Sequence, residues 1–179
     1  MKLIGKVTDI DIGEKLVEVN NPKKRTAVRT ILLNEKGEIA ILHKSKKNEY
    51  KLIGGGVDEG ETLDESLKRE VLEETGCEIG IISELGYIEE YRTRDNFTQT
   101  SYVYIAQVKK DTHQLHLTEA EAEEGAKLCW YKSNEALAKI AGSYEQLVPS
   151  KYADLYNTKF VIKRDEKILN YYILQENEN

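Results

Sequence analysis

Three glutamates within one predicted helical turn are the residues of this sequence best suited to chemistry. Glu70, Glu73 and Glu74 stand at positions i, i+3 and i+4, a spacing that brings side chains to one side of a helix. Like charges this close repel, and the repulsion raises the proton affinity of the carboxylates unless a cation neutralises them. Mg²⁺ and Mn²⁺ prefer such oxygen ligands, and Mg²⁺ usually shares its coordination shell with substrate phosphates. The pattern therefore favours metal-assisted phosphoryl or nucleotidyl chemistry.

The same residues also have a simpler interpretation, a solvated acidic face on which Arg69 pairs with Glu73. Against it, one stripe of the helical wheel changes from apolar to acidic: Leu63, Leu67, Glu70 and Glu74. A stripe that begins as a packing surface places its carboxylates near the protein body, where burial without a compensating cation is costly.

The elements that must position these glutamates can be read from the neighbouring residues. Thr62 and Glu65 form a capping-box pattern and Gly76 is a suitable C-cap, which predicts a helix over residues 62–76. A short strand over residues 50–53 leads directly into three glycines, residues 54–56. Glycine lets a backbone turn tightly and approach a ligand without a Cβ in the way.

The string from Gly55 to Cys77 resembles the Nudix box of the Nudix hydrolase superfamily, whose members include MutT-like proteins. The box reads G-x5-E-x7-R-E-U-x-E-E-x-G-U, where U is apolar, and every fixed letter is met at the right spacing. The order of predicted strands extends the resemblance over roughly residues 25–140. Ile53 stands where many members have Pro, and Asp58 where many have Glu.

The resemblance implies an α/β/α sandwich around a mixed sheet, in the α+β or α/β class, with extra C-terminal helices. It implies Mg²⁺-dependent hydrolysis of the diphosphate linkage in a nucleoside diphosphate joined to another moiety, with Mn²⁺ as a possible substitute. The implied metal ligands are the carbonyl of Gly54 and the side chains of Glu70, Glu73 and Glu74, the last three being catalytic. The implied supporting residues are Gly55, Glu61, Arg69 and Gly76, with Arg69 and Glu61 paired to orient the loop against the helix.

A second acidic cluster precedes Trp130 in a segment expected to be a loop: Glu119, Glu121, Glu123 and Glu124. The Glu124-Gly125 step resembles that of nucleotide-pool-cleaning family members, so Glu124 is the first candidate for an additional metal ligand and catalytic base. A solvated acidic loop is the alternative for each of these glutamates.

Two or more metal ions would neutralise the diphosphate and activate a water for in-line attack. Glu70 and Glu124 are both candidates to accept the proton of that water, since coupled carboxylates titrate as a group. A non-catalytic, nucleotide-sensing or regulatory Nudix-fold module is the alternative function. Because such a module needs no metal ligands, the intact set of glutamates favours the enzyme.

The remaining pattern predicts one domain over residues 1–179, with N-terminal strands or a hairpin over 1–24, the Nudix core over 25–140 and a helical extension over 141–179. Strands are expected at 26–33 and 38–43, joined as a hairpin, and at 81–91, 102–108 and 127–132, with a short helix that Ser133 caps. The Tyr-rich segment from residue 144 onward, with a break at Pro149, packs as helices on the core or forms a homodimer surface.

Composition excludes several other functions. The 26 Lys+Arg residues and 32 Asp+Glu residues give a net charge of −6, which disfavours a nucleic-acid polymer or an anionic membrane as partner. The expected partner is a small nucleotide. Two distant cysteines suggest neither a disulfide nor a zinc site, and no secretory segment is evident, so a cytoplasmic location is expected. Tyr87 and Tyr91, beside the polar segment 92–99, either stack a nucleobase or simply pack in the sheet.

Overall fold

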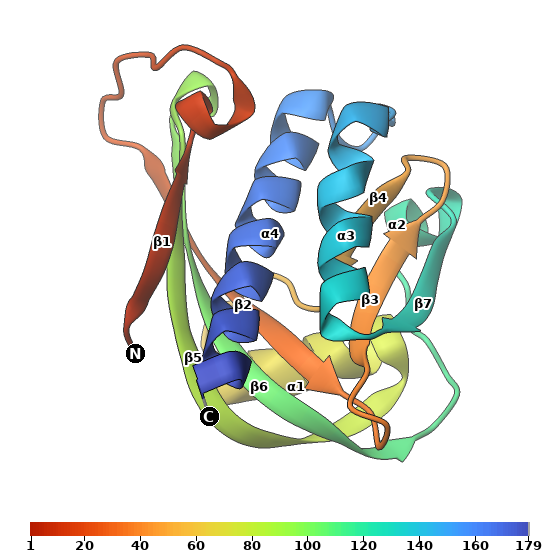
Figure 1. Cartoon of the computed structure of the whole chain (residues 1–179). Coiled ribbons are helices and arrows are strands. Elements are labelled where there is room, and N and C mark those ends of the chain that lie inside the picture. Colours follow the sequence, from red (N-terminus) through yellow and green to blue (C-terminus); the bar gives the residue numbers. More distant parts are fainter. Residues whose placement is uncertain (179) are drawn as a thin grey trace.

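A mixed sheet of seven strands carries helices on both of its faces in the computed structural model of this chain, which describes residues 1–178 (Figure 1). The strands are β1 (Leu3–Thr8), β2 (Lys23–Leu33), β3 (Ile39–Lys44), β4 (Glu49–Leu52), β5 (Cys77–Arg92), β6 (Phe97–Asp111) and β7 (Ala126–Tyr131). The α-helices are α1 (Leu63–Thr75), α2 (Glu119–Glu123), α3 (Ser133–Ser143) and α4 (Leu155–Glu178), and the 3₁₀ turns are η1 (Asp9–Ile12), η2 (Thr93–Asp95) and η3 (Tyr144–Gln146). This architecture confirms the predicted fold class.

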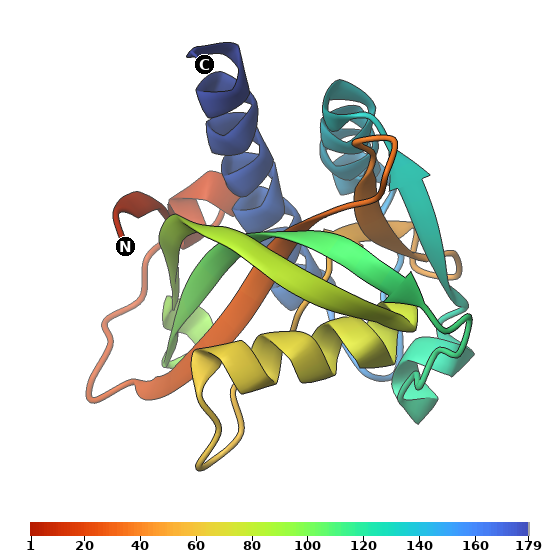
Figure 2. The same ribbon diagram turned by 90° about the horizontal axis from the view of Figure 1, so that it is seen from below.

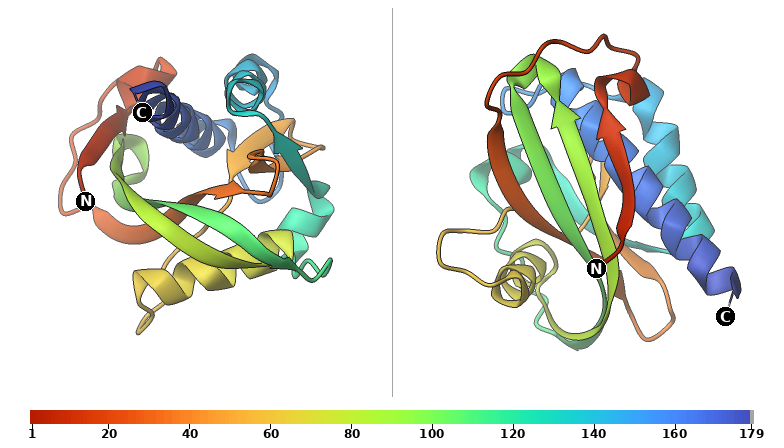
Figure 3. Two further views of the ribbon diagram at one scale, coloured as in Figure 1. Left: turned by 60° about the horizontal axis from the view of Figure 1, so that its bottom comes forward. Right: turned by 90° about the vertical axis from the view of Figure 1, so that its left-hand side faces the viewer.

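The strands are hydrogen-bonded in the order β1-β5-β6-β2-β3-β4, and β7 pairs with β3 (Figure 3). β2 runs parallel to β6 along its whole length, whereas it pairs with β3 only at Leu33 and Ile39. The expected hairpin between these two strands is therefore present, but it opens immediately after its turn. The loop that follows β4 bridges to β2 instead, at Thr30–Ile53 and Ala27–Gly56.

Side chains that alternate along β2 enter two separate cores. Val28 and Leu32 pack with Leu67 and Val71 of α1 on one face. Ile31 belongs to the other core, which α3 and α4 cover. Figure 2 shows α1 on one side of the sheet and these two helices on the other. The acidic helix and the C-terminal helix thus lie on opposite faces, with β2 between them.

The helix of the Nudix box forms as its local sequence predicts. Thr62 adopts the extended N-cap conformation and exchanges both capping-box hydrogen bonds with Glu65. Gly76 ends the helix with a left-handed φ of 70°, and its N–H donates to the carbonyl of Leu72. These caps fix the turn that carries the three glutamates.

The expected N-terminal hairpin is wrong, since β1 is the one strand found within residues 1–22 of the described chain. After β1 the chain turns through η1, where the buried carboxylate of Asp9 accepts hydrogen bonds from the Tyr156 hydroxyl, at 2.6 Å, and the Thr93 N–H. The long-range contacts of this polar side chain therefore set the path of the segment. The alternation of apolar and polar residues, on which the hairpin was predicted, does not reveal such contacts. β1 itself pairs in parallel with β5.

Two smaller expectations are also corrected. The acidic segment before Trp130 is not a loop throughout, because Thr118 and Glu121 form a capping box that starts the short helix α2. Ser133 is the first residue of α3, while Lys132 occupies its N-cap position without a side-chain hydrogen bond. The strands expected at 81–91 and 102–108 are present and longer than expected.

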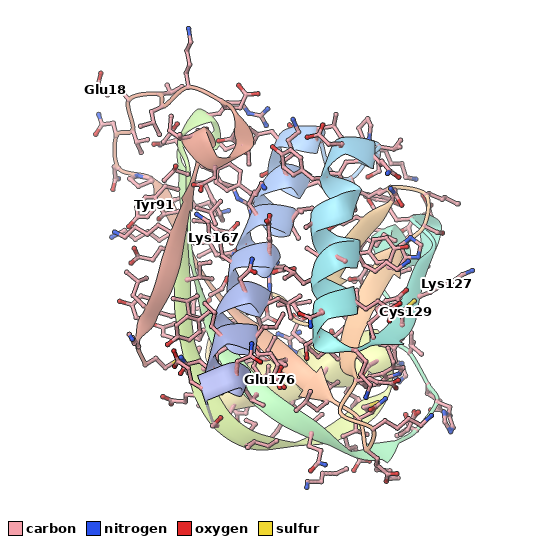
Figure 4. The ribbon with its side chains drawn as sticks, in the orientation of Figure 1. Glu18, Tyr91, Lys127, Cys129, Lys167 and Glu176 are labelled. Atoms are coloured by element: carbon pink, nitrogen blue, oxygen red, sulfur yellow. The ribbon has the colours of Figure 1, made fainter. Side chains whose placement is uncertain are left out.

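The C-terminal extension consists of η3, an irregular stretch that includes Pro149, and one long helix, α4. Phe160 and Leu169 are completely buried in the core beneath it, so the apolar face of α4 is used within the chain. Lys167 ties the helix to the N-terminal strand region through Asp11, at 2.6 Å (Figure 4). The homodimer stays a prediction. No helix within residues 1–178 has the length and apolar character needed to cross a bilayer.

Replacing the C-cap glycine should destabilise the protein. In Gly76→Ala, the new Cβ lies 2.8 Å from the carbonyl oxygen of Gln114, and alanine disfavours the left-handed conformation. We expect a loss of about 2 kcal/mol in the free energy of unfolding. The control is Gly142→Ala in α3, where a Cβ meets no atom within 4 Å and should stabilise by about 0.5 kcal/mol. Urea unfolding measures both, and equal effects of the two substitutions would contradict this account.

Candidate active site

The glycine loop passes so close to its neighbours that side chains would not fit. A Cβ on Gly54, whose φ is +132°, would lie 2.2 Å from the carbonyl oxygen of Val28 in β2. A Cβ on Gly55 would lie 2.3 Å from the carboxyl group of Glu70. The backbone of the loop is thereby held between the central strand and the acidic helix.

Arg69 fastens this loop to the helix. Its guanidinium forms a two-pronged pair with Glu61, with Nε to Oε1 at 2.7 Å and Nη2 to Oε2 at 2.8 Å, and it donates to the carbonyl of Gly56. Hydrogen bonds from Arg69 lower the pKa of Glu61 to about 2. The predicted charge pair is therefore present, and Arg69 also contacts Glu70 at 2.8 Å.

Glu74 is the buried member of the three glutamates. One carboxylate oxygen lies 2.6 Å from the ammonium of Lys51 in β4, and the other accepts the Gly54 N–H at 2.8 Å. Burial lowers the pKa of Lys51, but the adjacent carboxylate outweighs that effect and leaves the pKa raised. The contacts of Glu74 join β4, the glycine loop and α1.

The three carboxylates have different surroundings. Glu74 is enclosed, Glu70 is largely covered, and the side chain of Glu73 is 38% exposed with Arg69 at 3.4 Å. Within residues 1–178, no three Asp, Glu, His or Cys side chains lie close enough together to form a metal cage. The expected convergence on one point is thus not seen, because Lys51 and Arg69 draw the carboxylates toward themselves.

The second acidic segment brings two glutamates toward this region. Glu124 is buried, with one oxygen 2.9 Å from the Lys44 ammonium and the other accepting from the Ser150 hydroxyl. These partners lower its pKa against the opposing effect of burial. Glu121 lies close enough to Glu74 for their charges to repel, and that repulsion contributes to the raised pKa of Glu74, whose main cause is burial.

Two hollows lie near the loop. A cleft of about 580 Å³ is lined by residues of β2, β5 and β6, among them Arg25, Tyr91 and Gln99. Arg25 approaches the loop so closely that a Cβ on Gly56 would meet its guanidinium. A second cavity, of about 300 Å³, lies between the strands and α4, and Lys51 lines it.

Several charged residues of this region escaped the sequence analysis. They are Arg29, Lys44, Lys47, Lys51 and Arg164, and all of them line the smaller cavity. One signal was available, because Lys51 lies in the short strand that leads into the glycine loop. The others come together through the fold alone. Of the two tyrosines singled out, Tyr91 lines the larger cleft, while Tyr87 packs near Tyr102.

Fold and site together define a protein of the α/β/α sandwich type, built around a capped acidic helix and a glycine loop. Comparison with known proteins identifies the class more closely. The NUDIX domain model matches residues 23–150. The RNA pyrophosphohydrolase of Sulfurovum sp. (strain NBC37-1) is 30% identical over 137 residues, which is 68% of this chain and 85% of the relative.

Two further matches are shorter or more distant. A putative 8-oxo-dGTP diphosphatase of Bacillus subtilis (strain 168) is 34% identical over 65 residues, 36% of this chain and 44% of that protein. Among solved structures, a NUDIX hydrolase from Nitrosomonas europaea superposes with a TM-score of 0.59 at 17% identity, covering 86% of this chain and 90% of that one. This structural likeness supports the fold.

The chain belongs to the Nudix family, and it is a pyrophosphohydrolase. Members of this family generally use divalent metal ions.

The Arg69–Glu61 pair predicts a specific dependence of stability on pH. Because the pKa of Glu61 is about 2 in the folded protein and 4.5 in the reference state, its contribution is fully present above pH 4.5 and is lost as pH falls toward 2. Glu61→Gln should therefore lower the unfolding free energy relative to wild type near neutral pH, and the difference should shrink toward about pH 3. Urea unfolding across this range measures it.

Glu18→Gln provides the control, since Glu18 projects from the exposed segment after η1 (Figure 4) and should show no such difference at any pH. A difference between wild type and Glu61→Gln that grows as pH falls would contradict the assignment.

Proposed function

We propose that this protein hydrolyses the diphosphate linkage of a nucleoside triphosphate or related small nucleotide with Mg²⁺ as the metal, Mn²⁺ being a possible substitute. The observation that carries the proposal is the enclosed carboxylate of Glu74, held by Lys51 against the glycine loop at the end of the acidic helix. A carboxylate in this position supports the binding of positive charge next to the glycine loop.

The chemistry of the donor set fits a hard divalent cation. Glu70, Glu73 and Glu74 offer carboxylate oxygens from one turn, and Glu121 adds negative charge nearby. The carbonyl oxygens of Gly55 and Gly56 already accept hydrogen bonds, whereas no donor within residues 1–178 is bonded to that of Gly54. Bound there, the metal would supply charge neutralisation for the diphosphate and acidify a water.

The residues of the chain support that chemistry by position. Lys51 and Arg69 form ion pairs with Glu74 and Glu70 and so hold these two carboxylates in place beside the loop. Arg69 and Glu61 hold the loop against the helix. Glu70 and Glu124 are the proposed acceptors of the water proton, and Glu121 is a third candidate because of its proximity to Glu74.

The nucleoside part of the substrate is assigned to the larger cleft. Tyr91 offers an aromatic ring, Gln99 an amide and Arg25 a guanidinium, and Arg25 adjoins Gly56 of the loop. The name of the Bacillus subtilis relative, putative 8-oxo-dGTP diphosphatase, supports a nucleoside triphosphate. The name of the Sulfurovum relative introduces RNA as a second substrate to be tested.

Carboxamide substitutions test the proposed metal ligands. Glu73→Gln and Glu74→Gln should each reduce turnover by orders of magnitude, because both remove a metal-binding charge. Glu74→Gln also leaves the Lys51 ammonium without its carboxylate and should lower stability, so unfolding curves check that the fold survives in both variants. Glu78→Gln is the matched control, since Glu78 lies on the exposed side of β5 and pairs with Lys110. Products formed with Mg²⁺ from nucleoside triphosphates, nucleotide sugars, dinucleoside polyphosphates and RNA, identified by mass, provide the measurement.

Wild-type rates in both variants would overturn the site assignment. Tight binding of a nucleotide without turnover of any compound in the panel would favour the alternative, a nucleotide-sensing module.

The same assay separates the two glutamates of the second acidic segment. If Glu124 acts as ligand or base, Glu124→Gln should lower turnover by about 100-fold or more, whereas Glu121→Gln should lower it only slightly. The reverse order would assign that role to Glu121. Thermal unfolding of both variants provides the control for stability, because Glu124 also pairs with Lys44.

A further inference from the structure

The smaller cavity gathers positive charge on the face of the sheet that α4 covers. Six cationic side chains line it: Arg29, Lys44, Lys47, Lys51, Arg92 and Arg164. Only two carboxylates share this lining, Glu49 and Glu124. The cations come from strands β2 to β5 and from α4, so the cavity exists only in the assembled fold.

Three arginines that line this cavity each have one guanidinium nitrogen that is buried and has no hydrogen-bond partner within residues 1–178. These nitrogens are the Nε atoms of Arg29 and Arg92 and the Nη2 atom of Arg164. Arg29 and Arg164 are 6% and 1% exposed. A buried donor without an acceptor costs about 1–3 kcal/mol. Three such donors on arginines that line one cavity indicate a ligand that is rich in acceptor oxygens.

Carboxylates fix other nitrogens of Arg92 and Arg164, whereas Arg29 donates from Nη1 to the backbone carbonyls of Val28 and Gly55. Arg164 donates from Nε to Asp165 at 2.7 Å and from Nη1 to Glu90 at 3.4 Å. Arg92 contacts Glu90 at 2.7 Å. The arrangement therefore requires little reorganisation to accept an anion, and rigid guanidinium forks match phosphate oxygens.

Electrostatics within the cavity agree with this geometry. Burial, followed by the charge of Arg164, lowers the pKa of Arg29 to about 10. The charges of these two guanidinium groups thus repel each other. An anion between them would relieve both the repulsion and the unpaired donors.

The lining favours a phosphate over a nucleobase. Tyr152 is the one aromatic residue that lines this cavity, and its side chain is largely exposed. Lys44 of β3 and Lys47 of the turn after it also line the cavity, with Lys44 paired to Glu124 and Lys47 to Glu49. Such a wall suits an oxygen-rich group with negative charge on every side.

We propose that this cavity binds a phosphate group of the substrate beyond the two phosphates of the cleaved linkage, an inference that rests on the proposed function. Lys51 connects the two places, because it lines the cavity and also pairs with Glu74. The preferred substrate class is then a chain of three or more phosphates, ahead of two-phosphate compounds such as nucleotide sugars. Arg164 lies outside the segment 23–150 that matches the family model, so α4 adds this preference.

Binding of inorganic phosphates to the full chain in EDTA tests the cavity without turnover. Calorimetry should show that tripolyphosphate binds at least about tenfold more tightly than orthophosphate. Lys44→Gln and Arg164→Lys should each weaken tripolyphosphate binding by about tenfold. Lys127→Gln is the matched control on β7, where the side chain extends into solvent away from the cavity (Figure 4), and it should bind like wild type.

Because Arg164 is buried, an unfolding curve is measured for each variant. If Arg164→Lys does not fold, tripolyphosphate binding by Lys44→Gln tests the proposal alone. Unchanged tripolyphosphate affinity in Lys44→Gln, or no binding by wild type, would overturn the proposal. Equal Mg²⁺-dependent cleavage of nucleotide sugars and nucleoside triphosphates would also overturn it while leaving the proposed function intact. Binding that depends on Lys44 in a protein that cleaves no nucleotide would support the cavity and overturn the proposed function.

Discussion

The structure of the site depends on one buried carboxylate and the groups that compensate it. An ionised side chain removed from water costs several kcal/mol unless it is paired and hydrogen-bonded. Glu74 meets this condition through the Lys51 ammonium and the Gly54 N–H. Because these three residues belong to α1, β4 and the loop between them, satisfying one charge fixes the relative positions of all three elements.

The sheet provides the space that this arrangement requires. β2 and β3 separate after Leu33 and Ile39, and the glycine loop enters between them and bonds to β2. Gly54 and Gly55 permit this approach, because a Cβ at either position would meet the β2 backbone or Glu70. As a result, the acidic helix on one face and the cationic side chains on the other meet at the same loop.

Local sequence predicted the acidic helix accurately, since Thr62, Glu65 and Gly76 specify its ends without help from the rest of the fold. The same reasoning would have found α2, where Thr118 and Glu121 repeat the capping-box pattern. The N-terminal hairpin was wrong for the opposite reason: the buried hydrogen bonds of Asp9 link segments more than 80 residues apart. The spacing of polar residues along a chain does not predict hydrogen bonds between such distant segments.

The site shows the same division between local and long-range information. The glutamates, the glycines and the Arg69–Glu61 pair lie within one continuous segment, so a motif identifies them together. Lys51 could be suspected from its place next to the glycines. Arg164 could not, because its neighbours in the cavity, Arg29 and Arg92, become neighbours only when α4 packs across the sheet.

The way α4 is attached indicates that it belongs to the site. Asp165 is completely buried; one carboxylate oxygen accepts the Leu52 N–H of β4 at 2.8 Å and the other accepts from Arg164. The helix is thus bonded to the backbone two residues before the glycine loop, and the same carboxylate orients a cavity arginine. A surface devoted to another protein would leave the apolar face of α4 free, yet Phe160 is buried within this chain. The C-terminal extension therefore forms a wall of the smaller cavity, and any second role must use the outer face of α4.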